Sequence, residues 1–303
     1  MARSVITDPS MAHHKSSPPP QLRCGGRVLD ISSPQVMAVM NVTPDSFSDG
    51  GQFYAGTSLN LDSILAAVEG ALADGATLID IGGESTRPGA SPVSQQEECD
   101  RVLPVVEAVA ARFDVVISVD TSSPEVMRGA VDLGAGMLND VRALRRDGAL
   151  AAAADCGVPV CLMHMQGEPA SMQQKPEYRD IVAEVKAFLA ERSAACREAG
   201  LLDNHILWDP GFGFGKSLSH NLQLFNALPH LAETGYPLLV GVSRKSMLGA
   251  VTGRDVDQRM AASVTMAALA AERGAAILRV HDVRETADAL AMVAALKKEK
   301  DQA

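Results

Sequence analysis

The chain has 303 residues, of which 47% are hydrophobic and 21% charged, a composition typical of a globular enzyme with a sizeable core. Its net charge of −10 argues against general binding to nucleic acid or an anionic membrane, so any anion site must be a local basic cluster. The five cysteines form no C-x-x-C pair, which indicates free thiols in a reducing cytoplasm.

The N-terminal residues 1–21 include the stretch HHKSSPPP and show no hydrophobic periodicity, so we expect a disordered tail there. We expect residues 22–303 to form one catalytic domain. The first twenty residues lack the apolar run of a signal peptide. No stretch of about 18 uncharged apolar residues occurs, so no membrane span is expected.

Eight short apolar runs follow, and most are continuous rather than alternating, as parallel strands covered by helices require. The runs are VMAVM (36–40), TLIDI (77–81), VVISV (115–119), GMLND (136–140), VPVCLM (158–163), HILWD (205–209), PLLVGV (237–242) and AAILRV (275–280). The segments between them place apolar residues at helical spacing. This pattern predicts an α/β fold, a single-domain (β/α)8 TIM barrel. The main alternative is a doubly wound sheet, but the first loop, NVTPDSFSDGG, lacks its glycine fingerprint.

Polar residues follow every one of these runs, and in such a barrel the site lies at the C-terminal ends of the strands. Any one of them could instead cap a helix or be a satisfied buried group, but eight strand ends together favour a polar pocket. The residues are Asn41, Asp80, Asp120, Asn139, Asp140, His164, Asp209, Ser243, Arg244, Lys245, Arg279 and His281.

These polar residues divide by charge. Asp120, Asn139 and Asp209 offer acceptors that suit the N–H groups of a flat, nitrogen-rich heterocycle. Positive charge that suits a phosphate or carboxylate comes from Arg87, Lys245, Arg279 and His281. The combination indicates a heterocycle that carries an anionic leaving group.

Three glycine-rich or proline-rich segments remain. NVTPDSFSDGGQFYAG and GGESTRPGASPVS are long enough to be lids or binding loops, with plain surface turns as the alternative. DPGFGFGKS (209–217) resembles a nucleotide phosphate loop, but Pro210 stands where that motif needs its first glycine. We therefore interpret its Gly-Lys-Ser end as a helix start, with Ser217 as the cap.

Metal binding leaves little trace in this sequence. There is no H-x-x-x-H or Cys/His cluster, so structural zinc is not expected. Magnesium held by one or two protein oxygens and by substrate phosphates would leave almost no motif.

Seven stretches, taken together, closely resemble the dihydropteroate synthases of the folate pathway. They are MNVTPDSFSDGG (40–51), DIGGESTRPGA (80–90), SVDTSSPEVMRGAVDLGAGMLNDV (118–141), CLMHMQGEPASMQ (161–173), DPGFGFGK (209–216), VGVSRKSMLG (240–249) and RVHDV (279–283). The resemblance implies a TIM barrel, a homodimer and assistance by Mg²⁺. It also implies condensation of (7,8-dihydropterin-6-yl)methyl diphosphate with 4-aminobenzoate, and competition by sulfonamides for the aminobenzoate pocket.

The resemblance also assigns residues to parts of the site. For the pterin, these are Asp120, Asn139, Met163, Asp209, Gly241 and Lys245. For the diphosphate, they are Asn41, Arg279 and His281, with Asn41 also the metal ligand. For 4-aminobenzoate and its covering loops, they are Phe47, Thr86, Arg87, Pro88, Phe214, Ser243 and Lys245. Asp49 resembles a residue that completes the site after diphosphate forms, and it joins Asp120, Asp209, Lys245, Arg279 and His281 as the implied catalytic residues.

Three other functions stay open from the sequence. A Schiff-base aldolase would use Lys245, which sits at a strand end. A non-catalytic pterin-binding paralogue would keep the pocket and lose the activity. A pterin-dependent methyltransferase with the same barrel would not be expected to carry the two long loops.

Overall fold

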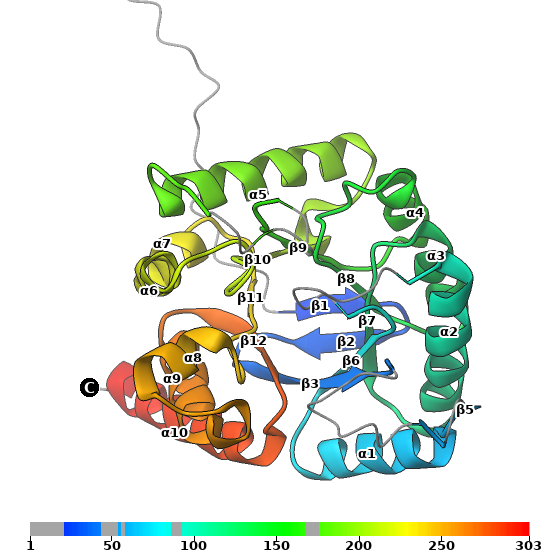
Figure 1. Cartoon of the computed structure of the whole chain (residues 1–303), viewed down its shortest axis with the longest axis horizontal. Helices are drawn as coiled ribbons and strands as arrows, with labels where there is room; N and C mark the ends of the chain where they lie inside the picture. Colours follow the sequence, from blue (N-terminus) through cyan, green and yellow to red (C-terminus); the bar gives the residue numbers. More distant parts are fainter. Residues whose placement is uncertain are drawn as a thin grey trace, which may run out of the picture.

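The structure, a computed structural model, describes residues 21–43, 54–55, 58–85, 93–167, 172 and 176–302. Eight parallel strands close into a barrel in the order β10-β11-β12-β3-β6-β7-β8-β9, with helices around the outside (Figure 1). The strands are β3 (Gln35–Asn41), β6 (Leu78–Gly82), β7 (Val116–Asp120), β8 (Met137–Asp140), β9 (Val160–Met163), β10 (Ile206–Asp209), β11 (Leu238–Val240) and β12 (Ala275–Val280). The predicted TIM barrel and all eight of its strands are confirmed.

The helices lie between successive strands and cover the barrel. They are α1 (Leu61–Ala73), α2 (Gln95–Arg112), α3 (Pro124–Asp132), α4 (Ala149–Cys156), α5 (Ile181–Glu198), α6 (Leu218–Asn226), α7 (Leu228–Ala232), α8 (Ser246–Thr252), α9 (Met260–Glu272) and α10 (Val283–Gln302), with 3-10 turns η1 (Asp203–His205) and η2 (Val256–Gln258). The expected cap of α6 is confirmed, because the Ser217 side chain accepts a hydrogen bond from the His220 N–H at 3.2 Å.

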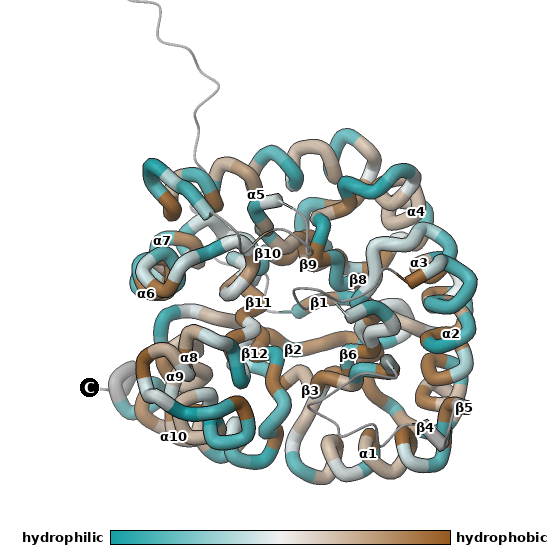
Figure 2. The backbone as a smooth tube through the Cα atoms, in the orientation of Figure 1, coloured by the Kyte–Doolittle hydropathy of each residue, from teal (hydrophilic) through white to brown (hydrophobic). Residues whose placement is uncertain are grey.

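The main core lies between the outer face of the strands and the inner faces of these helices. Along each strand one residue in two faces outward, so Ile79 and Ile117 join Val68 of α1 and Val106 of α2 in this core. Hydrophobic residues accordingly colour the strands and recur along the helices in Figure 2. The expected apolar face of α1 is confirmed, with Ile64 and Val68 fully buried.

A second, smaller core lies inside the barrel at the N-terminal ends of the strands. A β-hairpin, β1 (Gln21–Cys24) with β2 (Arg27–Asp30), closes this end and contributes Leu22, Cys24 and Leu29. Each barrel strand contributes to this core, which contains Met37, Leu78, Val116, Met137, Cys161, Leu207, Leu239 and Ile277, with Ala276 as a second residue from β12. This set is called the apolar floor below. This hairpin was not expected from the sequence, and it begins at Gln21, which was expected to end the tail.

Residues 1–20 of the expected tail lie outside the described part of the chain. A further two-stranded ribbon, β4 (Tyr54–Ala55) with β5 (Ser58–Leu59), precedes α1. Within the described residues, no helix combines the length and the apolar character needed to cross a membrane.

The hairpin should be a substantial source of stability. Leu22 is fully buried in the apolar floor, so Leu22→Ala should lower the free energy of unfolding by about 2–4 kcal/mol, through lost burial and a residual cavity. Urea unfolding followed by circular dichroism would measure it. Val28→Ala on the same hairpin is the control, because Val28 is 54% exposed and its truncation should change stability by less than about 0.5 kcal/mol. Equal effects of the two substitutions would show that the hairpin does not close the core.

Candidate active site

The inside of the barrel is built in layers, because inward-facing side chains recur every second residue along a strand. One such step beyond the apolar floor, toward the C-terminal end of each strand, lies a mostly polar layer. Its members are Val39, Asp80, Ser118, Asn139, Met163, Asp209, Gly241 and Arg279. Five of these residues belong to the expected site, so the fold places them in one layer, directly above the apolar floor along the barrel axis.

Arg279 joins β12 to the side chains of two nearby strands, β6 and β7. From β12, its Nε donates to Asp80 Oδ2 on β6 at 2.6 Å, and its Nη2 donates to Asp120 Oδ2 on β7 at 2.9 Å. The neighbouring carboxylates raise the pKa of Arg279 despite its burial, so the guanidinium stays charged. A guanidinium has five N–H donors, and the two bonds therefore leave capacity for an anion at the rim.

Asp80 holds the polar layer together, although the sequence analysis named it only as a strand end. Its side chain is fully buried and also accepts from Ser118 Oγ at 2.6 Å and from Asn139 Nδ2 at 3.3 Å. Asn139 is thereby oriented with its amide nitrogen turned to Asp80, which directs its carbonyl oxygen away from that carboxylate. The signal that identifies Asp80 is its place on the inward face of β6, two residues after Leu78 of the floor.

The expected heterocycle-reading acceptors come from neighbouring strands. Asp120 pairs in register with Asn139, and Asp209 pairs with Met163, so the four residues belong to the adjacent strands β7, β8, β9 and β10. Asn139, Met163 and Asp209 are each less than a tenth exposed. The structure therefore brings this part of the predicted site together. Asp120, Asn139 and Asp209 with the apolar Met163 form what is called the acceptor arc below.

Burial dominates the electrostatics of the two carboxylates in the arc. It raises the pKa of Asp209 to about 6, although the Gly211 N–H donates to its Oδ1 at 2.7 Å and the charge of Lys245 opposes the rise. Burial raises the pKa of Asp120 to about 7, with Arg279 opposing and Asp80 adding repulsion. Both carboxylates are costly to ionise in the absence of further donors, so a ligand with N–H groups would stabilise their charged forms.

An aromatic wall stands beside the arc. The Lys245 Nζ lies 4.2 Å from the centre of the Phe214 ring, a cation–π contact. Phe214 also packs against the buried cluster formed by Val141, Met163, Met165 and Met172. A flat ring entering from the rim would meet Phe214 on its apolar side and the ammonium of Lys245 at its edge.

The expected anion end lies at the exits of β11, β12 and β3. Asn41 ends β3, which pairs with β12 on one side and β6 on the other. His281 follows β12, and its Nδ1 lies 3.0 Å from Ser243 Oγ. Ser243 therefore lies beside His281, and its assignment to the aminobenzoate side by the resemblance stays a prediction.

His281 also differs from expectation in its charge. Burial, together with the charges of Arg279 and Arg244, lowers the pKa of His281 to about 3. The imidazole is therefore neutral at pH 7 and offers a hydrogen bond to an anion, whereas the sequence analysis assigned it positive charge. The positive charge near His281 comes instead from Arg279, Arg244 and Lys245.

Asp282 is another residue that the sequence analysis did not single out. It accepts from Arg244 Nη2 at 2.6 Å, which ties the exit of β11 to the exit of β12. Arg244 has a φ of 56°, in the left-handed region that non-glycine residues seldom adopt. This backbone turn lies directly between Ser243 and Lys245, so the ion pair helps to set the direction of both neighbours.

Several expected residues fall outside the described part of the chain. They are Phe47 and Asp49 of the first long loop and Thr86, Arg87 and Pro88 of the second. In the part that is described, no group of three or more His, Cys, Asp or Glu side chains is arranged to hold a metal ion. A metal at this end would need most of its ligands from a substrate.

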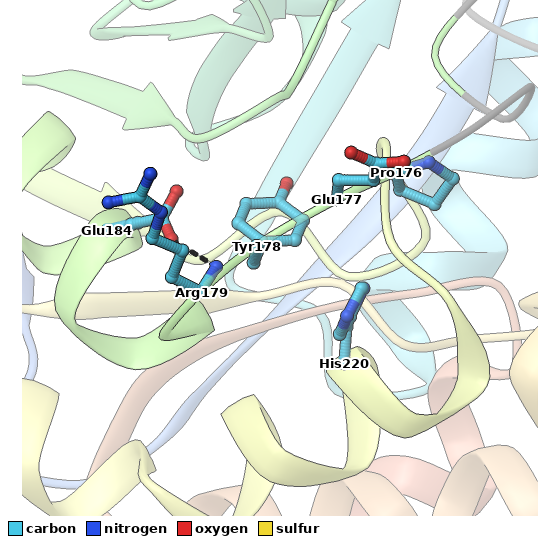
Figure 3. A pocket seen from close by; sticks show the side chains of 6 residues that line it. All are labelled: Pro176, Glu177, Tyr178, Arg179, Glu184 and His220. Carbon is cyan, nitrogen blue, oxygen red and sulfur yellow. Dashed lines mark hydrogen bonds between the residues drawn. The ribbon is translucent and has the colours of Figure 1, made fainter.

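A hollow of about 630 Å³ lies outside the barrel mouth, lined by Pro176, Glu177, Tyr178, Arg179, Glu184 and His220 (Figure 3). The Tyr178 hydroxyl at its edge donates to the Gly215 carbonyl at 2.8 Å. The hollow is open to solvent and contains none of the expected site residues, so the polar layer remains the candidate site.

Comparisons with known proteins agree with this geometry. Residues 37–281 match the family of pterin binding enzymes. The chain is 52% identical to dihydropteroate synthase of Haemophilus influenzae over 270 residues, which is 89% of this chain and 96% of that protein. It is similar to a Yersinia pestis dihydropteroate synthase structure with a sulfonamide drug complex (TM-score 0.88, 52% identity, 92% and 99% of the two chains). It is also similar to a Xanthomonas albilineans dihydropteroate synthase structure with 4-aminobenzoic acid (TM-score 0.85, 51% identity, 93% and 99%).

The pH dependence of stability should reveal the burial of Asp209. Its pKa is higher in the folded than in the unfolded protein, so its contribution to stability is full below pH 4 and is lost as pH rises through about 6. Asp209→Asn removes this titration and keeps an oxygen for the Gly211 N–H. Without ligand, the variant should gain roughly 2 kcal/mol over wild type between pH 4 and pH 7.5.

Chemical unfolding of both proteins at the two pH values gives this difference directly. Asp257→Asn is the matched control, because Asp257 is exposed and its variant should track wild type at both pH values. A stability difference between Asp209→Asn and wild type that is independent of pH would contradict a raised pKa at Asp209.

Proposed function

The chain belongs to the pterin-binding enzymes and, within them, to the dihydropteroate synthases, and we propose that it condenses (7,8-dihydropterin-6-yl)methyl diphosphate with 4-aminobenzoate. The products are 7,8-dihydropteroate and diphosphate. The observation that carries the proposal is the polar layer above the apolar floor, which together with Asp120 at the end of β7 presents an arc of acceptors while Arg279 reaches in from β12.

The pterin would lie in the barrel mouth with its N–H groups toward the acceptor arc. Asp120, Asn139 and Asp209 would accept from the ring and its amino group. Met163 and Gly241 belong to the same layer and would line the ring, with Lys245 beside it. Binding would give the two buried carboxylates the donors that they need to stay ionised.

The aminobenzoate would lie between the pterin and solvent. The contact of Phe214 with Lys245 offers an apolar face for its ring and a cation near its carboxylate. The loop residues Phe47, Thr86, Arg87 and Pro88 would cover it, and Asp49 would complete the site after diphosphate forms. Sulfonamides would compete at this pocket, in keeping with the drug complex of the Yersinia pestis relative.

In the reaction, the bond between the pterin methylene carbon and the diphosphate oxygen breaks, and its electron pair leaves with the diphosphate. The pterin ring delocalises the resulting cation, and the carboxylates of Asp120 and Asp209 stabilise it. Arg279, His281 and Asn41 bind the departing diphosphate, His281 as a neutral donor. The amine of 4-aminobenzoate then attacks the methylene carbon and loses a proton, so no protein nucleophile is needed. The two long loops would exclude water from the cation.

We propose Mg²⁺ as the cofactor. Asn41 offers a hard oxygen ligand at the end of β3, between the exits of β12 and β6, and the diphosphate oxygens would supply further ligands. The metal would neutralise charge on the leaving group.

The alternatives are less well supported by these contacts. A Schiff-base lysine must be neutral to attack a carbonyl, whereas Lys245 faces an aromatic ring in a contact that favours the ammonium form. A non-catalytic paralogue shares the pocket, and only an activity measurement separates it from the synthase.

The activity assay tests the proposed function. Diphosphate release by purified protein should require both (7,8-dihydropterin-6-yl)methyl diphosphate and 4-aminobenzoate, stop on chelation and recover with Mg²⁺. Asp209→Asn should lower turnover at saturating substrates by at least about 10², because one stabiliser of the cation is lost. Asp257→Asn should have wild-type turnover.

The outcomes separate the parts of the proposal. No release by the wild-type protein with both substrates and Mg²⁺ present would refute the synthase. Release that persists undiminished after chelation would refute the metal alone.

We further propose that the chain works as a homodimer in a reducing cytoplasm. More than half of the large apolar side chains that are exposed in the described part of the chain lie between α8 and α10. They are Val251, Val256, Met260, Met292 and Leu296. A second copy would cover this apolar surface. The five cysteines are all free thiols, in keeping with a reducing compartment, and thiol titration of freshly extracted, denatured protein should find all five.

Replacement of Val251 and Met292 by glutamate should convert the dimer to a monomer, because charge would be buried in an apolar interface. Sedimentation velocity would measure the mass. Val28→Glu, on the hairpin at the other end of the barrel, is the control and should leave the dimer intact. A wild-type protein that sediments as a monomer at micromolar concentration would contradict the proposal.

A further inference from the structure

Lys216, which the sequence analysis treated as part of a helix start, is a buried cation with an unusual set of partners. Its side chain is only 3% exposed, although it directly precedes the cap of α6. Its Nζ donates to the carbonyl oxygens of Gly211 at 2.8 Å, Phe214 at 3.0 Å and His164 at 3.2 Å. The same Nζ lies 2.9 Å from His164 Nδ1. One ammonium is therefore enclosed by four acceptors from two separate segments.

These partners join the loop after β10 to the exit of β9. The two segments approach so closely that neither Gly211 nor Gly215 has room for a side chain. A Cβ at Gly211 would overlap the His164 carbonyl, and one at Gly215 would lie 2.6 Å from the Gln166 carbonyl. Both glycines also have positive φ, at 70° and 61°. The carbonyls that face one another across this contact would repel, and Lys216 is the cation placed between them.

The loop that Lys216 holds carries two residues of the proposed site. Gly211 donates its N–H to Asp209 Oδ1 at 2.7 Å, while its carbonyl accepts from Lys216. Phe214 gives its carbonyl to Lys216, while its ring lies under Lys245. The orientation of the Asp209 carboxylate and of the Phe214 ring is therefore linked to the same ammonium.

His164 faces the charged form of Lys216 as a neutral acceptor. Its ring packs against Phe188 in a T-shaped pair, with centroids 5.0 Å apart and planes at 87°. Burial and the neighbouring charge of Lys216 lower the pKa of His164 to about 3, so the ring is neutral, with Nδ1 as the acceptor. The charged or titratable groups that act on Lys216 are His164, Asp209 and Lys245.

We propose that Lys216 is a positioning residue of the synthase, which clamps the 209–216 loop onto the exit of β9 and so sets Asp209 for the pterin and Phe214 for the aminobenzoate. The inference rests on the proposed function, because it takes Asp209 and Phe214 as substrate-binding residues. Lys216 itself contacts neither substrate and acts through these two residues.

A purely structural lysine and a positioning lysine make different predictions. Loss of a structural lysine lowers stability and leaves the kinetic constants of the folded fraction unchanged. Loss of the clamp weakens the use of both substrates together, because a single loop presents both contacts. Removal of one substrate contact alone would instead affect one substrate.

The main test is the steady-state kinetics of Lys216→Met, which keeps the stem and removes the ammonium. We expect kcat/KM to fall at least tenfold for the pterin diphosphate and at least tenfold for 4-aminobenzoate. The enzyme concentration used to calculate both constants is the concentration of folded protein. Ser193→Ala is the matched control. On the outer side of the barrel, Ser193 Oγ accepts from Trp208 Nε1 and donates to the Leu189 carbonyl. Loss of these buried hydrogen bonds should lower stability without altering either kcat/KM.

A pH profile gives a second readout. Burial lowers the pKa of Lys216 to about 7, so the ammonium loses a proton within the assay range. Calorimetric binding of 6-hydroxymethylpterin to wild type should strengthen as Asp209 and Asp120 ionise and weaken again above about pH 7 as Lys216 becomes neutral. Lys216→Arg keeps the charge at every pH and should lack the additional weakening seen in wild type.

The outcomes are distinct. Wild-type kcat/KM values in Lys216→Met, or a loss confined to one substrate, would overturn the clamp. If Lys216→Met does not fold, the Lys216→Arg profile decides, and a profile identical to that of wild type would overturn the proposal. A wild-type enzyme without activity would refute the synthase itself, while the binding profile would still test the clamp.

Discussion

The two-residue period of side chains inside a closed parallel barrel is the constraint on which this structure depends. It separates each strand into an outward face that packs on helices and an inward face that fills the barrel. One step along the inward face changes the chemistry from an apolar floor, typified by Leu78 and Leu207, to the polar layer of Asp80 and Asp209. The floor, closed by the β1–β2 hairpin, excludes water from below, so the polar groups can be approached only from the rim. The depth of the site is thus set by strand geometry rather than by a loop.

That depth has an electrostatic consequence. Three carboxylates, those of Asp80, Asp120 and Asp209, share the interior with Arg279, and burial raises the pKa values of Asp120 and Asp209. A site optimised for stability would replace such carboxylates with neutral or apolar groups. Their retention is understandable if a ligand supplies the missing donors, since binding would then recover the free energy that burial costs. The carboxylates of Asp120 and Asp209 therefore lower the stability of the protein without ligand and raise its affinity for the pterin.

Most of the fold and much of the site follow from sequence patterns, and the failures have identifiable causes. Continuous apolar runs identified the eight strands, because both faces of each strand are buried. The β1–β2 hairpin was missed because each of its strands is only four residues long. Buried residues alternate with more exposed ones along these strands, so neither forms a continuous apolar run. Asp80 was passed over because its partners come from distant parts of the chain, and the neutral state of His281 depends on burial and on neighbouring cations, which no linear motif records. The two long loops remain a prediction, since their central residues lie outside the described part of the chain.

The segment DPGFGFGKS shows how closely these constraints can be combined. Asp209 belongs to the polar layer, Phe214 to the apolar cluster beside it, Lys216 to the contact with β9, and Ser217 to the first turn of α6. Its glycines at 211 and 215 have positive φ, and neither can be replaced by a residue with a side chain without a collision with His164 or Gln166. A nucleotide loop uses its glycines to bring backbone N–H groups to a phosphate, whereas here they bring one backbone against another. The buried lysine then makes that contact favourable, which is why a motif so close to a phosphate loop can serve a site whose anion end lies on other strands.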